Sequence, residues 1–533
     1  MSPVKPYLQK YYESYDGVAD LYTYFYEKGL KILKPDGVLS YIVTNKWLRA
    51  GYGEPLRRFF TQNSFFEQII DFGHAPIFED ADTFPCIVSV RRNLTPQPPS
   101  LRGKGEPQSN SSLLAGEGSG ERSELRAISP VLLCPVPREK LKDINLPQYV
   151  QQEGYRVPWS RFTANTWSLE PLAVDELIHK IRNVGVPLKD FAGIEIYRGV
   201  TTGFNQAFLI DYETKNRLIQ TDSKSAEVIK PYLRGQDIKR WIFNWQNLWM
   251  IFSRRGIDID AYPAIKAYLA QYRERLEPCP KNWDKNKDGN WNGRKSGTYK
   301  WNEIQDATEY WQLFEKPKIF YQEIQFHPWF SMSVESCFAN NKVSFIPSED
   351  LYLLAALNSP VMWWHNWRYL PHMKDEALAP VGYLMENLPI APPTDAIRAE
   401  VEPIVSRLIE ITKANQEAHR DVLDWLRIEH SIDKLGQKLE DFSSLYADEF
   451  VKEIKKRKPK NAGGFSPKAV KEAREVYNDY APAIQSRKDE ALTLEYRLSD
   501  LVNQAYNLTP EEIDLMWKTA PPRMPINRRQ YET

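Results

Sequence analysis

Apolar residues follow helical and strand spacing in turn through the first 93 residues of the chain. Residues 20–33 repeat apolar side chains at helical spacing, and the turn at residues 34–37 separates them from the apolar run of residues 38–44. A further helix is predicted at residues 54–62, and further strands at 67–72 and 86–91. Strands that alternate with helices indicate a parallel or mixed sheet with helices on its faces, so this segment is predicted to be α/β.

This pattern stops at residues 94–129, which are rich in Pro, Gly and Ser and have almost no large apolar side chains. Such a segment buries too little apolar surface to offset the entropy of ordering it, so we predict a disordered insertion. Residues 130–190 are interpreted as a connector.

Short strands, loops and aromatic residues mix in residues 191–395, which predicts an α+β domain. Apolar residues return to helical spacing in residues 396–533, for example from Val401 to Leu408. Within this helical tail, the charged stretch near residues 452–464 is interpreted as a mobile linker.

The composition bounds the class of protein. The 533 residues exceed what one core usually organises, since domains run to roughly 100–200 residues, so about three domains are expected. Lys and Arg together number 70, as do Asp and Glu, which excludes nucleic-acid binding by bulk charge and leaves local basic patches open. No apolar run has the roughly 20 residues of a membrane span, and the polar amino terminus lacks a signal-peptide core, so a cytoplasmic protein is expected.

Cysteine spacing gives no sign of a metal or redox site. Cys86, Cys134, Cys279 and Cys337 are far apart and form no CxxC pair, so buried thiols in a reducing compartment are expected. The histidines have no matching ligands nearby in the sequence, and none is assigned to a metal.

Six short motifs follow one another in the first 93 residues. They are Asp20-Leu21-Tyr22, Leu33-Lys34-Pro35-Asp36-Gly37-Val38, Ile42-Val43-Thr44-Asn45-Lys46-Trp47-Leu48, Leu56-Arg57-Arg58-Phe59-Phe60, Ile70-Asp71-Phe72-Gly73 and Ile77-Phe78-Glu79-Asp80. This ordered set resembles the second half of a TaqI-like adenine-N6 DNA methyltransferase domain of a restriction-modification system. The resemblance implies that residues 1–93 are the carboxyl-terminal remnant of a doubly wound methyltransferase sheet.

Motifs in residues 191–395 resemble the specificity domain of the same family, which recognises the DNA target. Residues 229–238 (IKPYLRGQDI) resemble the start of that domain, and residues 357–360 (LNSP) and 383–390 (YLMENLPI) resemble its end. Residues 191–204 resemble its first strand and loop. The helical tail resembles, less specifically, the ends of large fused restriction-modification enzymes.

The resemblance implies methyl transfer from S-adenosylmethionine to adenine N6 in double-stranded DNA, with one important departure. Family members carry a Gly-rich cofactor loop and an Asn-Pro-Pro-Tyr motif upstream of the matched segment, and neither occurs here. The Asn side chain and the Pro-Pro carbonyl hold the adenine amino group, and the Tyr stacks on the flipped base. We therefore expect this chain not to bind the cofactor or methylate alone, and we assign it no catalytic residue.

Three interpretations of the whole chain stay open. It could supply DNA recognition to a separate polypeptide that carries the catalytic half. It could be a DNA-binding specificity subunit without a catalytic role, or an inactive truncated product.

Phe78 matches the family's second base-stacking aromatic. Flipped bases are held between aromatic or apolar faces, so the resemblance implies that Phe78 forms one wall of the base pocket. The alternative is a core Phe between two strands.

Three groups of residues are candidates for DNA contact. The first is a loop flanked by Gly199 and Gly203. Arg and Asn side chains can read guanine and adenine in the major groove, so this loop is a candidate for base recognition. Alternatively, the loop is an ordinary turn that needs glycine. The second is a set of cations around Gly235, interpreted as a phosphate clamp or a solvated turn. The third is the basic and aromatic stretch at residues 291–301, with Arg368 further on. The residues concerned are Tyr197, Arg198, Thr201, Thr202 and Asn205; Lys230, Arg234, Lys239 and Arg240; and Arg294, Lys295 and Arg368.

Overall fold

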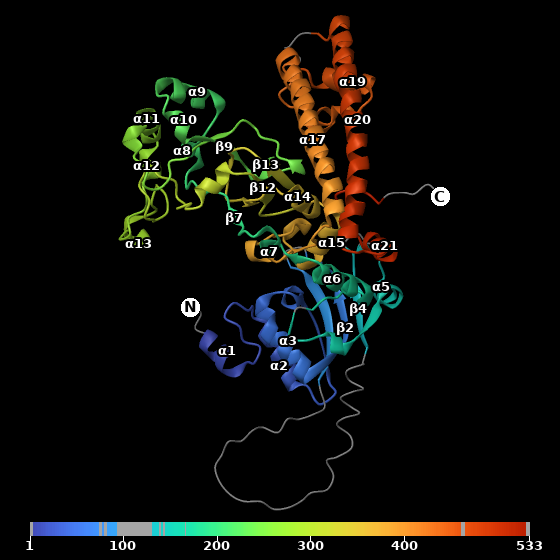
Figure 1. The fold of residues 1–533 in the computed structure, drawn as a ribbon. Helices are drawn as coiled ribbons and strands as arrows, with labels where there is room; N and C mark the ends of the chain where they lie inside the picture. The colour runs from blue at the N-terminus through green and yellow to red at the C-terminus, as the bar shows by residue number, and fades with distance from the viewer. Residues whose placement is uncertain are drawn as a thin grey trace, which may run out of the picture. The chain divides into compact units, whose positions relative to one another are not determined.

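The computed structural model describes residues 4–73, 77–78, 83–92, 130–137, 140–141, 144–165, 167–459 and 464–528 (Figure 1). The chain divides into two compact units, Met1–Leu177 and Ile178–Thr533. The predicted disordered insertion at residues 94–129 lies outside the described residues.

The first unit is built on a five-stranded mixed sheet with the strand order β1-β3-β2-β4-β5. Only β2 and β4 run parallel, and the other neighbouring strands are antiparallel. Its elements are α1 (Lys5–Tyr11), α2 (Tyr22–Ile32), β1 (Val38–Thr44), η1 (Lys46–Leu48), η2 (Gly51–Gly53), α3 (Glu54–Asn63), β2 (Ser64–Asp71), β3 (Pro85–Arg92), β4 (Pro130–Pro135), α5 (Leu146–Glu153), β5 (Tyr155–Pro158) and η4 (Trp159–Arg161). The elements predicted in residues 20–91 are all present, and the mixed α/β class is confirmed.

Residues 130–158 are more than the connector that we predicted. They add β4 and β5 to the sheet and α5 beside it, because Val131 and Leu133 of β4 are fully buried. The six residues of β4 (PVLLCP) are too short a run to show a strand period in the sequence.

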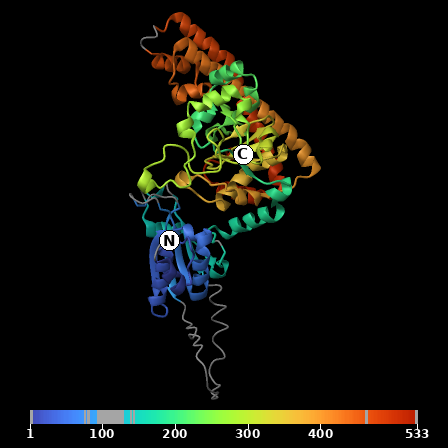
Figure 2. The same cartoon turned by 90° about the vertical axis from the view of Figure 1, so that its left-hand side faces the viewer.

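Aromatic packing holds the first unit together. Helices α2 and α3 contact the sheet (Figures 1 and 2). Beneath them Trp47, Phe60, Phe66 and Trp167 are buried, with ring centroids 4.9–6.4 Å apart in the pairs that touch. Each such ring buries a large apolar area, so this cluster is the main core of the unit.

The second unit begins within α6 (Leu172–Val184), which the boundary after Leu177 divides, and its first part is β-rich. It contains a five-stranded sheet (β10-β13-β12-β15-β7), a four-stranded sheet (β14-β9-β11-β8) and the pair β16-β6. Its elements are α6 (Leu172–Val184), β6 (Val186–Pro187), α7 (Leu188–Ala192), β7 (Tyr197–Arg198), α8 (Asn205–Phe208), β8 (Leu209–Ile210), α9 (Tyr212–Thr221), α10 (Ser225–Val228), β9 (Ile229–Leu233), η5 (Gly235–Asp237), β10 (Trp241–Ile242), β11 (Trp249–Ile251), η6 (Ile259–Ala261), α11 (Pro263–Ala270), α12 (Arg273–Leu276), α13 (Lys285–Asp288), η7 (Trp311–Glu315), β12 (Lys318–Gln322), β13 (Phe330–Ser333), β14 (Phe338–Ala339), β15 (Val343–Ile346), α14 (Leu351–Leu357), α15 (Pro360–Tyr369), η8 (Lys374–Glu376), α16 (Gly382–Glu386) and β16 (Pro389–Ile390).

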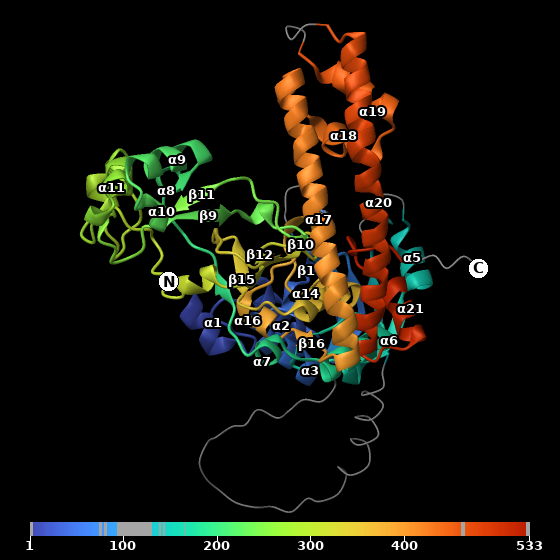
Figure 3. The ribbon, with the colours of Figure 1, turned by 45° about the horizontal axis from the view of Figure 1, so that its top comes forward.

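The rest of the second unit is helical, as the apolar spacing predicts. The long helices α17 (Asp395–His430) and α20 (Pro467–Ala505) lie side by side (Figures 1 and 3). Shorter elements pack with them: α18 (Gly436–Glu440), η9 (Phe442–Ser444), α19 (Ala447–Arg457) and α21 (Pro510–Lys518). The side chain of Thr509 caps α21 by accepting from the N–H of Glu512, with Pro510 in the first turn.

The linker predicted near residues 452–464 was wrong over its first half. Residues 452–457 are the last turns of α19, where Ile454 is fully buried and Phe450, one turn earlier, packs in the same core. The high charge of this stretch lies on the outer face of an amphipathic helix, which the count of charges alone did not reveal. Residues 460–463 lie outside the described residues.

Cys86, Cys134 and Cys337 are buried, and Cys279 is partly exposed, all as free thiols. Among the described residues, no helix is long and apolar enough to cross a membrane.

Candidate nucleic-acid interface

The Gly-flanked loop leaves β7 and is fixed at its start. Tyr197 packs against Tyr310 and Phe345, with ring centroids 4.8 and 5.8 Å away. A Cβ on Gly199 would lie 2.0 Å from the carbonyl oxygen of Asn340, so only glycine fits there. Gly203 has a φ of 82°, which also favours glycine. Both glycines are therefore required by the backbone of the turn, in agreement with the interpretation of this loop as a turn that needs glycine.

The side chains of this loop divide into inner and outer ones. The backbone N–H of Thr201 donates to the Asp306 carboxylate at 2.8 Å, and Thr202 is buried with its hydroxyl donating to Asn205 Oδ1 at 2.6 Å. Thr202 is therefore a structural residue, contrary to our prediction of DNA contact. Arg198 and Asn205 are exposed and stay candidates for contact.

Arg294 is also structural, contrary to our prediction. Arg294 is only 3% exposed. Its guanidinium donates to five backbone carbonyls, those of Leu276, Thr202, Glu303, Lys300 and Trp301. Burial lowers the pKa of Arg294 to about 10. The side chain thus binds the loop at residues 294–303 to the Gly-flanked loop, while its neighbour Lys295 is exposed.

The cations near Gly235 are held by partners within the chain. Lys230 lies 2.7 Å from Glu315, Arg234 pairs with Asp237 at 2.9 Å, and the ammonium of Lys239 lies 4.5 Å above the ring of Trp329. Arg234, with over a third of its side chain exposed, can still meet a phosphate at the surface.

Arg240, predicted for the clamp, and Arg368, a separate candidate for DNA contact, both make packing contacts within the chain. Arg240 donates to the Glu495 carboxylate and to the Asn358 carbonyl, both at 2.8 Å, and its side chain is mostly buried. Arg368 lies 4.1 Å over the ring of Trp364 and donates to the Thr519 carbonyl at 2.8 Å. Both arginines join the β-rich part to the helical part of the second unit.

Four arginines that the sequence motifs did not indicate form what we call the arginine–aromatic array. Each guanidinium carbon lies 5.0–5.9 Å from the centroid of an aromatic ring. The pairs are Arg254 with Trp311, Arg255 with Tyr299, Arg273 with Trp301 and Arg275 with Phe204. Arg254, Arg273 and Arg275 are exposed.

The array surrounds the two loops that Arg294 joins. Arg255 donates to Thr298 Oγ1 at 3.0 Å and to the Gln305 carbonyl at 2.7 Å, and Phe204 belongs to the Gly-flanked loop. Cations held over aromatic faces suit both phosphate contact and base stacking. The interleaving of basic and aromatic residues that singled out residues 291–301 also marks Tyr272, Arg273 and Arg275, and would have found them.

A second exposed aromatic group lies in the turn between β12 and β13. Phe326 is exposed, with the Arg523 guanidinium 5.5 Å from its ring, and His327 stacks on Trp329 at 4.6 Å. Burial, Arg523 and Lys239 lower the pKa of His327, so its imidazole is neutral at pH 7. This group adds further planar faces to the same unit.

In the first unit, the predicted stacking residue Phe78 is 44% exposed. At the end of β2, the Asp71 carboxylate accepts from Asn45 Nδ2 at 2.7 Å and from the N–H of Gly73 at 3.1 Å. Burial raises the pKa of the Asp71 carboxyl. The exposure of Phe78 disagrees with the alternative of a core Phe between two strands.

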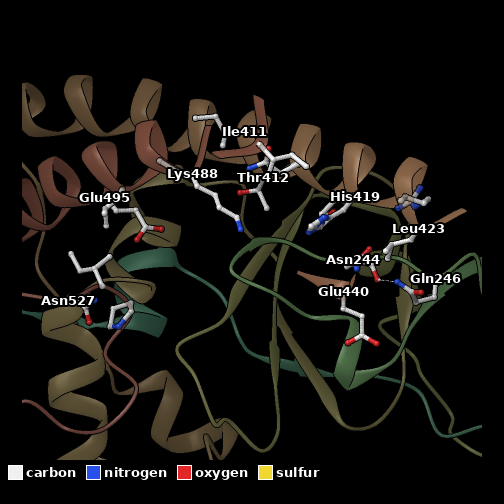
Figure 4. Close-up of a pocket in the computed structure, with 18 of the residues that line it drawn as sticks. Asn244, Gln246, Ile411, Thr412, His419, Leu423, Glu440, Lys488, Glu495 and Asn527 are labelled. Atoms are coloured by element: carbon white, nitrogen blue, oxygen red, sulfur yellow. Dashed lines mark hydrogen bonds between the residues drawn. The ribbon is translucent and has the colours of Figure 1, made fainter. Parts of the chain in front are cut away.

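A groove of about 720 Å³ lies among α17, α20, the turn at residues 244–246 and residues 524–527 (Figure 4). Two of its charged groups are held by partners: Lys488 donates to Asp441 and Ser443, and Glu495 accepts from Arg240 and Trp241. Among the described residues, no three His, Cys, Asp or Glu side chains are grouped to hold a metal ion.

Comparison with known families confirms the resemblances seen in the sequence motifs. Residues 2–78 match the Eco57I restriction-modification methylase, and residues 230–390 match the TaqI-like C-terminal specificity domain. Residues 394–502 match a domain of unknown function, DUF8810.

The chain is similar to two type II methyltransferases in sequence and to one solved restriction-modification enzyme. The type II methyltransferase M.PaeR7I of Pseudomonas aeruginosa is 26% identical over 290 residues, which cover 52% of this chain and 44% of that protein. The type II methyltransferase M.BstVI of Geobacillus stearothermophilus is 22% identical over 460 residues, which cover 79% and 72%. The type IIL restriction-modification enzyme MmeI, solved in complex with DNA, aligns with a TM-score of 0.47 and 11% identity over 98% of this chain and 55% of that chain.

Proposed function

We propose that this chain, a homologue of type II restriction-modification methyltransferases with a TaqI-like specificity domain, supplies the DNA-recognition part of a site-specific adenine-N6 DNA methyltransferase. The observation that carries the proposal is the arginine–aromatic array, whose four arginines all lie within the TaqI-like match at residues 230–390. A neutral chain needs such a local concentration of cations to contact phosphates.

The residues of the interface divide the work. The exposed guanidinium groups of the array hold the phosphate backbone, which positions the duplex without reading its sequence. Arg198, Asn205 and Lys295, exposed on the loops inside the array, read base edges in the major groove. Arg294 keeps the two loops in one arrangement, so little order has to be gained when DNA binds.

Phe78 would take part in base flipping in the intact assembly. An exposed ring beyond the end of β2 can stack on an adenine that has left the duplex. S-adenosylmethionine would supply the methyl group. The residues of this chain do not fit that cofactor, because the sequence contains neither an Asn-Pro-Pro-Tyr motif nor the Gly-rich cofactor loop that the family carries upstream of the matched segment. A segment outside residues 1–533 would have to supply both.

The test is DNA binding by the purified chain, starting with selection from a random-sequence duplex pool and then anisotropy on the enriched duplex. Arg273→Ala with Arg275→Ala should weaken binding and reduce the slope of log K against log salt by about one for each phosphate that is no longer neutralised. The matched control is Arg474→Ala with Arg487→Ala on α20, which should leave both quantities unchanged. No enrichment of any duplex, or equal losses in both double variants, would refute the proposal.

A further inference from the structure

The turn between β12 and β13 has its polar and apolar side chains reversed. Ile324 and Phe326 are 39% and 40% exposed, while Gln325 between them is fully buried. Neither the oxygen nor the nitrogen of the Gln325 side chain has a hydrogen-bond partner among the described residues. Burying an unpaired amide costs free energy, and so does leaving large apolar side chains in water. Folding alone therefore does not explain why Ile324 and Phe326, which we call the apolar tip, are exposed.

Contacts with two other segments hold the apolar tip in place. Gln325 exchanges backbone hydrogen bonds with Leu378, at 2.9 and 2.8 Å. The Arg523 guanidinium lies 5.5 Å from the centre of the Phe326 ring and donates to the carbonyls of residues 375 and 376 at 3.2 and 3.1 Å. Those two residues have φ values of 56° and 60°, which side chains with a Cβ rarely adopt. The apolar tip is thus fixed in one arrangement before a partner binds.

The start of the turn lies beside residues that we propose to contact DNA. Arg198 Nη2 is 3.5 Å from the Glu323 carboxylate, and the backbone N–H of Glu323 donates to the carbonyl of Lys342 at 2.9 Å. Gln322 Nε2 donates at 2.6 Å to the carbonyl of Gly235, around which the predicted phosphate clamp lies. The turn that carries the apolar tip is therefore next to the Gly-flanked loop and to the predicted clamp.

The end of the turn lies against positive charge as well. The ammonium of Lys239 is 4.5 Å from the centre of the Trp329 ring, and Arg523 lies over Phe326. An apolar centre with cations around it matches a DNA duplex, in which phosphates flank stacked bases. The bordering cations are Arg198, Arg234, Lys239, Lys342 and Arg523; of the acids nearby, Glu323 and Glu376 pair with Arg198 and Arg523, and Asp375 is exposed.

We propose that the apolar tip inserts at a base step of bound double-stranded DNA and unstacks it. Proteins that kink DNA use exposed Phe, Leu or Ile side chains as wedges in this way, while cations hold the phosphates. The free-energy cost of unstacking is offset by the contacts that the kinked duplex makes with the bordering cations. The inference rests on the proposed function, since it takes the recognised duplex as the occupant.

The test measures kinking of the duplex enriched by selection, labelled at its two ends with a donor and an acceptor dye. An inserted wedge kinks DNA by roughly 20–90°, so energy transfer should rise when the full chain saturates the duplex. Ile324→Ser with Phe326→Ser should abolish that rise. Phe326→Leu should retain it, because leucine also serves as a wedge.

The matched control is Val334→Ser with Ile428→Ser, at side chains that are 67% and 76% exposed. The control should leave the rise in energy transfer unchanged. Since the apolar tip holds no phosphate, Ile324→Ser with Phe326→Ser should also leave the slope of log K against log salt unchanged. All four side chains are exposed, so circular dichroism should show unchanged folding of each variant.

Duplex binding without a rise in energy transfer in the unsubstituted chain would overturn the inference and leave the proposed function standing. A rise that survives Ile324→Ser with Phe326→Ser, or that is lost in the control or in Phe326→Leu, would overturn it too. A chain that binds no duplex would refute the proposed function and this inference with it. Sedimentation without DNA tests a rival occupant: a dimer that dissociates in the double variant of the apolar tip would assign the tip to a second copy of the chain and reject DNA.

Discussion

Arg294 and Lys295 are neighbours in the sequence with opposite roles. Both carry a positive charge in a stretch of basic and aromatic residues, but Arg294 points into the protein and satisfies five carbonyls while Lys295 points to solvent. Lysine could not replace Arg294, because a single ammonium cannot span the positions that a planar guanidinium reaches.

Substitution at these two positions should separate stability from DNA binding. Arg294→Ala leaves buried carbonyls without donors and should lower the free energy of unfolding by about 3 kcal/mol or more. Lys295→Ala should change it by less than about 0.5 kcal/mol and weaken DNA binding. Urea unfolding and anisotropy on the same samples check both. A stable Arg294→Ala variant that no longer binds DNA would show that the guanidinium contacts DNA after all.

His365 makes the stability of the second unit depend on pH. Complete burial, with the nearby Arg182, lowers the pKa of its imidazole to about 3. The unfolded chain takes up this proton near pH 6.5 and the folded chain does not, so the free energy of unfolding should fall as the pH drops from about 6.5 toward 3.

His365→Gln should make that slope shallower by up to about 1.4 kcal/mol per pH unit. Urea unfolding at pH 7, 5.5 and 4 provides the measurement. His419 and His430, whose pKa values are also lowered by burial, keep contributing in the variant, so the comparison with the unsubstituted protein is essential. If the free energy of unfolding depends on pH in the same way in His365→Gln and in the unsubstituted protein, His365 is protonated in the folded protein.

At the residue scale, the sequence did not show which side chains of the candidate segments point inward. The Gly-flanked loop and Arg294 come together through a hydrogen bond from Arg294 to the Thr202 carbonyl, which the sequence analysis did not predict. Whether Thr202 or Arg294 points inward depends on tertiary contacts more than 90 residues away in the sequence, which no local pattern contains. Arg273 and Arg275 share the local interleaving of basic and aromatic residues, but their aromatic partners, Trp301 and Phe204, are distant in the sequence and could not be identified from it.

At the scale of elements, Glu495 links helix α20 to the β-rich part of the second unit. Its Oε1 accepts from Arg240 Nε and from Trp241 Nε1, each at 2.8 Å, and both charged side chains are mostly buried. A buried pair of this kind is costly to break because the remaining charge loses its partner.

Glu495→Ala should therefore destabilise the second unit by about 2 kcal/mol or more. The matched control is Glu490→Ala on the same helix, whose partner Arg407 is exposed. That control should leave the melting temperature almost unchanged. Thermal unfolding followed by circular dichroism gives both values. Equal decreases in melting temperature in the two variants would show that the Glu495 contact stabilises the protein no more than an exposed ion pair does.

Elements with a clear apolar period were predictable, and elements defined by their neighbours were not. The helix at residues 54–62 and the strand at 38–44 are observed as Glu54–Asn63 and Val38–Thr44. Strands β4 and β5 owe their place to pairing with β2 and with each other, so residues 130–158 resembled a connector. Charge misled us at α19, where a helix face was interpreted as a linker.

At the scale of the whole molecule, the family matches divide between the two units. The Eco57I methylase match lies in the first unit, and the match to the TaqI-like specificity domain lies in the second. Because the sequence contains no Asn-Pro-Pro-Tyr, residues 1–533 alone should neither bind S-adenosylmethionine nor transfer its methyl group. Titration calorimetry with the cofactor, and a tritium-transfer assay beside M.PaeR7I as positive control, test this. Measurable heat of binding would place a cofactor site within these residues.

The distribution of the thiols equips this protein with a built-in reporter. Three of the four cysteines are buried, and the partly exposed one, Cys279, donates its backbone N–H to the carbonyl of Arg294 at 2.9 Å. A maleimide fluorophore should therefore attach at a single place, beside the loops that the arginine–aromatic array surrounds, without any cysteine being removed. Its emission would follow a duplex arriving and leaving in real time, and would separate association from dissociation for each arginine variant.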